Sequence, residues 1–138
     1  MTTLPDRLLA PLAPFAPTLL RLVMGVLFLA HGIVWKLVQV GGTNVVAWFV
    51  SQGYPAWFGW TVIAVEIAGG VALLLGWRVR LVALGLAGLM AGIVLHQFPN
   101  GWIYTSANGG WEYPAFWTAA LLALAMLGPG RLALDNRA

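Results

Sequence analysis

Four long apolar stretches dominate the chain, and short segments rich in glycine, proline or charge separate them. They cover residues 18–40, 55–77, 79–98 and 113–127, and each ends at residues that break helices. A helix needs about 20 residues to cross the hydrocarbon of a bilayer. The pattern therefore predicts an all-α fold, an integral membrane four-helix bundle. We expect it over residues 18–128, between a cytoplasmic or interfacial N-terminal segment, 1–17, and a cytoplasmic tail, 129–138.

The connections refine this picture. The link between the second and third helices consists only of residues 77–80, so these two helices form an antiparallel hairpin. In the first outer loop, residues 41–54, Thr43 is placed to cap a short interfacial helix that runs to Ser51. The N-terminal segment contains four prolines, which disfavour a long helix there.

Composition supports a membrane location. Of the 138 residues, 61% are hydrophobic and 8% charged, against about 25% charged in an average soluble domain. A soluble fold of this size has no means of covering so much apolar surface. The net charge of +3 comes from scattered residues, so no nucleic-acid partner is expected. Because the chain has no cysteine, it has no thiol chemistry or thiolate-bound metal of its own.

The positive charges predict an orientation. Membrane proteins concentrate Lys and Arg on the cytoplasmic side. With both termini inside, all the basic residues except Lys36 lie on that side: Arg7, Arg21, Arg78, Arg80, Arg131 and Arg137. Most of the tryptophans and tyrosines lie on the other side. We therefore expect a multi-pass protein of a bacterial inner (plasma) membrane, with both termini cytoplasmic and any specific site on the outer side.

Three glycines in the third stretch share one helix face. Gly85, Gly88 and Gly92 recur at helical spacing, and the last two form a GxxxG pair. Small residues of this kind let neighbouring membrane helices approach closely. We expect this face to pack against another helix.

Two polar residues fall near the middle of the predicted membrane. His31 lies about 15 Å and Glu66 about 18 Å above the inner boundary set by the arginines. A carboxylate at this depth needs a partner or a proton. His31 is the first candidate partner of Glu66. The two side chains are candidates for proton handling, and a purely structural pair is the alternative.

A second polar level lies nearer the outer surface. Lys36 and His96 lie roughly 22 to 24 Å above the same boundary. Lys36 is expected to extend to the interface or to contact a ligand. The second outer loop is expected to return Glu112 toward these two residues, as a polar lid over an apolar cavity. The candidate ligand-binding residues are Lys36, His96, Asn100, Asn108 and Glu112. No metal is expected, because no spacing typical of histidine and carboxylate ligands is present.

Several sequence segments resemble the DoxX family of small four-helix membrane proteins. They read LLRLVMGVLFLAHGIVWKL, VEIAGGVALLLGWRVRLVAL, HQFPNGW and NGGWEYPAFWTAALLALAMLGPGRLALD, and together they extend over residues 18–135. The resemblance implies a membrane subunit of a redox system, similar to subunits named for thiosulfate:quinone oxidoreductase. It also implies other membrane subunits as partners beside the lipid bilayer.

The sequence is compatible with three functions. The first is a quinone-linked oxidoreductase subunit that holds a quinone, or a similar amphipathic molecule, noncovalently in an outer-leaflet cavity. The second is a non-catalytic accessory or assembly subunit of a larger membrane complex. The third is a small transporter or channel, although four short helices enclose little volume.

Overall fold

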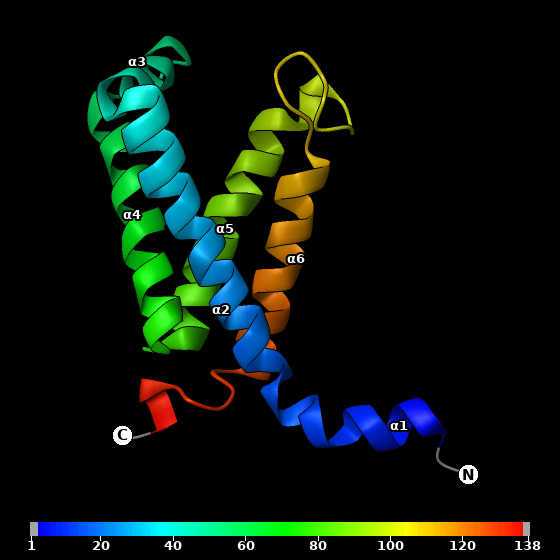
Figure 1. Ribbon diagram of the computed structural model, residues 1–138. Helices are drawn as coiled ribbons and strands as arrows, with labels where there is room; N and C mark the ends of the chain where they lie inside the picture. The colour runs from blue at the N-terminus through cyan, green and yellow to red at the C-terminus, as the bar shows by residue number, and fades with distance from the viewer. Residues whose placement is uncertain (1–2, 137–138) are drawn as a thin grey trace.

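The computed structural model describes residues 3–136, which are helical throughout apart from turns and loops (Figure 1). The long elements are α2 (Ala16–Leu29), continued by the π-type helix η2 (Ala30–Gly41), then α4 (Ala56–Leu75), α5 (Val79–Gln97) and α6 (Glu112–Leu127). The short ones are α1 (Leu4–Leu9), η1 (Ala10–Phe15), α3 (Gly42–Ser51), η3 (Phe98–Asn100) and η4 (Leu134–Asn136). The predicted all-α fold is confirmed.

Three helical stretches are long and apolar enough to cross a membrane. They are Leu4–Ser51, Ala56–Leu75 and Val79–Asn100. The fourth apolar helix, Glu112–Leu127, has 16 residues and is shorter. These lengths and compositions fit a multi-pass membrane bundle.

The four long helices form two pairs. α2 packs on α4, and α5 packs on α6. In Figure 1 the pairs meet near α1 and the C-terminal segment and diverge toward α3. We call the end of the bundle where the pairs meet the closed end, and the end where they diverge the open end. A cluster of buried apolar side chains joins the two pairs; it includes Phe28, Leu73, Val79, Leu121 and Leu124.

Side chains complete the backbone hydrogen bonding at the closed end. Arg21 is 1% exposed. Its guanidinium donates to four carbonyl oxygens: Leu73 and Leu74 of α4, and Pro129 and Leu132 of the C-terminal segment. The last carbonyls of a helix lack partners within it. Arg21 therefore both caps α4 and holds the C-terminal segment under the bundle.

The C-terminal segment in turn caps α5. The Asp135 carboxylate accepts hydrogen bonds from the backbone N–H groups of Arg78 and Val79, at 2.7 and 2.9 Å. At the end of α6, Arg80 donates to the carbonyls of Ala125 and Met126. Residues 129–136 are thus part of the folded unit. Arg137, one of the arginines counted for orientation, lies outside the described residues.

Two local expectations need correction. α3 begins at Gly42, directly after Gly41, whose φ is +88°. No side chain caps its N-terminus within the described chain, so the predicted Thr43 cap is wrong. The proline-rich N-terminal segment, in which the prolines were expected to disfavour a long helix, is helical from Leu4: α1 and η1, of six residues each, lead without a break into α2 at Ala16. Pro5 and Pro11 occupy first-turn positions, where proline is tolerated.

Candidate ligand-binding cavity

A cavity of about 1190 Å³ opens between the two helix pairs at the open end. Residues of η2, α3, α4, α5, α6 and the loop before α6 line it. Most of the wall is apolar or aromatic; representative residues are Val45, Phe58, Val62, Met90, Ile93 and Trp117. The volume lies somewhat above the range of about 300–1,000 Å³ that is typical of small-molecule sites.

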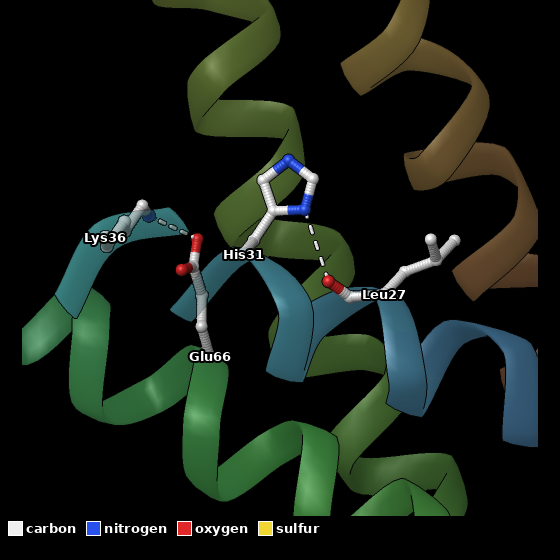
Figure 2. A network of polar contacts seen from close by, with 4 residues as sticks. All are labelled: Leu27, His31, Lys36 and Glu66. Carbon is white, nitrogen blue, oxygen red and sulfur yellow. Dashed lines mark hydrogen bonds and ion pairs between the residues drawn. The ribbon is translucent and has the colours of Figure 1, made fainter. Parts of the chain in front are cut away.

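Lys36 and Glu66 form a buried ion pair in the wall of this cavity. The Lys36 Nζ lies 2.6 Å from the Glu66 Oε1 (Figure 2). The two residues are 7% and 3% exposed. The second carboxylate oxygen, Oε2, is buried and has no hydrogen-bond partner within residues 3–136. Lys36 therefore does not extend to the interface, as the sequence suggested, but turns into the bundle.

Helix geometry explains why these two residues meet despite their different heights. The Cα–Cβ bonds of a helix tilt toward its N-terminus. α2 with η2 and α4 run in opposite directions (Figure 1). The Lys36 side chain therefore leans back toward the closed end and that of Glu66 toward the open end. The two tilts together make up for the difference in height of about 4 Å between Lys36 and Glu66 that the rise per residue gives.

His31 lines the same cavity but does not pair with Glu66, so the predicted His31–Glu66 partnership is wrong. Its Nδ1 lies 3.2 Å from the carbonyl oxygen of Leu27, one turn earlier (Figure 2). Since a carbonyl only accepts, Nδ1 carries the hydrogen, and a neutral ring keeps Nε2 as an acceptor. The ring also packs edge-on against Trp117, with centroids 5.1 Å apart. His31 is therefore a separate polar group on the cavity wall.

The glycines of α5 face open space, contrary to the prediction of helix packing. A Cβ placed on Gly85, Gly88 or Gly92 meets no atom of the described chain within 4 Å. Gly88 and Gly92 line the cavity instead. The close helix contact lies elsewhere: a Cβ on Gly25 would be 3.0 Å from the backbone oxygen of Gly70. The missing side chains on α5 thus contribute to the volume of the cavity.

His96 lies where the cavity meets a smaller hollow of about 290 Å³. Asn108 lines both spaces, whereas Asn100 lines the smaller one and donates to the carbonyl of Asn108 at 3.0 Å. The His96 ring packs edge-on against Trp48 of α3, with centroids 5.6 Å apart. His96, Asn100 and Asn108 therefore lie together, at the loop-covered end of the cavity.

Glu112 lies away from the cavity-lining set within the described chain. Its Oε1 accepts a hydrogen bond from the backbone N–H of Tyr104, at 3.0 Å, in its own loop. The expectation that Glu112 turns toward Lys36 and His96 is therefore wrong. A carboxylate beside free backbone N–H groups is readily satisfied locally.

Sequence reasoning missed several aromatic residues of the wall. Trp35, Tyr54 and Trp117 all line the cavity. Trp117 is 6% exposed, and it lies within α6 rather than at its end. Tryptophans that anchor a protein at the membrane interface lie near the ends of spans. The position of Trp117 inside the fourth apolar stretch could therefore have indicated from the sequence that it faces the interior. Within residues 3–136 no group of three metal-ligating side chains is found.

Two comparisons with known proteins bear on this cavity. The family model of DoxX matches residues 16–97, which include Lys36, Glu66, Gly88 and His96. The chain is also similar to the "Putative oxidoreductase CatD" of Bacillus subtilis (strain 168). The two are 28% identical over 117 residues, which cover 85% of this chain and 82% of the relative. No solved structure matches the chain.

Proposed function

Because the chain belongs to the DoxX family, we propose that it is a membrane subunit of a redox system whose open-end cavity holds a quinone or a similar amphipathic molecule. The observation that carries the proposal is the cavity itself. It combines about 1190 Å³ of space and aromatic walls with polar groups in two places, Lys36 with Glu66 and His96 with Asn108. The apolar ring and tail of a quinone would pack against the aromatic walls, and its ring oxygens would hydrogen-bond to the polar groups.

The redox part of the proposal is supported by the Bacillus subtilis relative, whose name is "Putative oxidoreductase CatD". We infer that electrons come from a partner subunit or a soluble substrate. On this proposal Lys36 and His96 bind the ligand, and His31 and Glu66 handle protons. A histidine side chain and a carboxylate each exchange protons readily when they lie beside a reacting group.

The proposal also includes an orientation. With both termini in the cytoplasm, the closed end with its arginines faces inward and the cavity lies in the outer leaflet of the bacterial inner membrane. α3 would then lie in the outer interface. The positive-inside rule supports this arrangement, since Arg21, Arg78 and Arg80 all lie at the closed end.

Ligand-dependent thermal stability tests the proposal. The full chain in lipid nanodiscs should melt at a higher Tm when a short-chain ubiquinone analogue is added, because a ligand at 100 times its Kd stabilises by about 2.7 kcal/mol. Gly92→Leu should reduce the rise, because its side chain takes up space inside the cavity. Gly85→Leu is the matched control, because Gly85 lies on the same helix and likewise has open space around it, without lining the cavity.

Two results would contradict the proposal. One is an unchanged Tm with any quinone, and the other is a rise that Gly92→Leu leaves intact. If the chain is instead recovered with a larger complex after mild detergent extraction and binds no quinone, the accessory or assembly function takes its place.

A further inference from the structure

We propose that the cavity selects its ligand by hydrogen-bonding state, and binds the hydroxyl-bearing, reduced form of a quinone in preference to the oxidised form. This inference rests on the proposed function and specifies the ligand of the same site. The observation behind it is the incomplete hydrogen bonding of the Lys36–Glu66 pair.

The pair has unused capacity on both sides. Glu66 uses Oε1 for Lys36, while Oε2 is buried without a partner in the part of the chain that the structure describes. A carboxylate has about four acceptor positions, and an ammonium has three donors. Leaving a buried charged oxygen unpaired is costly. Both residues line the cavity. Because Oε2 itself is closed off from the cavity, a turn of the Glu66 carboxylate about its last side-chain bond is needed before an occupant supplies the missing partner.

A hydroxyl group fits this pair better than a carbonyl does. The O–H of a hydroquinone donates to Glu66 Oε2, and its oxygen accepts from the Lys36 ammonium. A quinone carbonyl only accepts, so it satisfies Lys36 and leaves Oε2 unpaired. The pair therefore recognises a group that is donor and acceptor at once.

His31 adds to the preference. With Nδ1 engaged by the Leu27 carbonyl, Nε2 is the ring nitrogen left for a ligand (Figure 2), and it acts as an acceptor in the neutral form of the ring. His31 lines the same cavity as Glu66. Acceptors on the wall favour a ligand that brings its own donors, as the two hydroxyls of a hydroquinone do.

The expected selectivity follows from the missing bond. A hydrogen bond to a charged group corresponds to roughly a 10- to 100-fold change in affinity. We therefore expect the reduced form to bind at least about 10-fold more tightly than the oxidised form.

The test uses one short-chain ubiquinone analogue in both redox states. The oxidised form is used without reductant, and the reduced form is prepared with dithionite and kept under anaerobic conditions. Their Kd values are measured by titration calorimetry with the full chain in nanodiscs. Glu66→Gln is the informative variant, because its amide can keep an oxygen toward Lys36 and turns a donor to the ligand. Its preference should disappear or invert. Glu112→Gln, the same change at a residue outside the cavity lining, should keep the wild-type ratio.

Equal affinity for the two forms in the wild type would overturn the inference, and so would a preference that persists in Glu66→Gln. The wild-type ratio needs no variant, so it decides the matter even if Glu66→Gln fails to fold. Binding of neither form would overturn the proposed function itself. Binding of both forms without preference would overturn only the inference.

Discussion

The two ends of the bundle treat buried charge in opposite ways. At the closed end, Arg21 is 1% exposed and its guanidinium donates to four backbone carbonyls. At the open end, Glu66 is 3% exposed, yet one of its oxygens has no partner in the described residues. The first charge completes the fold. The second leaves hydrogen-bonding capacity beside a cavity, which is what a binding site requires and a purely structural contact does not.

The largest effect is expected at the closed end, from Arg21→Met. The substitution leaves several buried carbonyls without donors and releases the C-terminal segment. We expect the free energy of unfolding to fall by about 3 kcal/mol or more, since each buried unpaired group costs about 1–3 kcal/mol. Unfolding by urea in detergent micelles measures the change.

Arg131→Met is the matched control for that experiment. Arg131 is exposed, and its guanidinium lies 5.2 Å from the centre of the Phe15 ring. Losing this exposed contact should cost about 1 kcal/mol or less. Equal losses in the two variants would show that Arg21 does not hold the closed end together.

The ion pair of the open end gives the next effect. Glu66→Ala leaves the buried Lys36 ammonium without its partner, and we expect a loss of about 2–3 kcal/mol in unfolding free energy. Glu66→Gln should lose less, because the amide still accepts from Lys36. The double variant Lys36→Met with Glu66→Leu should be less destabilised than Glu66→Ala, since no unpaired charge remains. Additive losses in a double-mutant cycle would contradict the pairing.

These two charge clusters also show what the sequence could predict. The apolar stretches, their breaks and the helical hairpin followed from length and composition, and the structure agrees closely with them. The partner of Glu66 did not follow, because depth along an axis ignores the tilt of side chains on antiparallel helices. The role of Gly88 and Gly92 was missed for a related reason: a glycine stripe indicates space, and only the divergence of the helix pairs leaves that space open.

A smaller effect is expected from Asp135→Ala, which removes the cap on α5. Loss of such a cap typically costs about 0.5–2 kcal/mol. Asp6→Ala serves as the control, because Asp6 belongs to a capping box with Thr3 on α1, away from the bundle. Thermal unfolding of the bundle should respond to Asp135→Ala and little to Asp6→Ala. The reverse order would mean that the C-terminal segment contributes nothing to the closed end.

The smallest effects come from a pair of glycines, and they should have opposite signs. Gly88→Ala should raise the free energy of unfolding by up to about 1 kcal/mol, because alanine favours helix and nothing in the described chain obstructs its methyl group. Gly70→Ala should lower it, because its Cβ would lie 2.9 Å from Leu29 and 3.0 Å from the Gly25 oxygen. Changes of the same sign would contradict the distinction between packing and cavity glycines.

The most direct test of the account is to locate the bound ligand chemically. An azido-quinone analogue is irradiated with the full chain in nanodiscs, and the labelled peptides are identified by mass spectrometry. We predict labels on the cavity-lining parts of α5 and α6, near Met90, Ile93 and Trp117. An excess of unlabelled quinone and Gly92→Leu should each suppress them, while Gly85→Leu should not. Labels at the closed end around Arg21, or labels that excess quinone does not displace, would contradict the claim that the open-end cavity is the binding site.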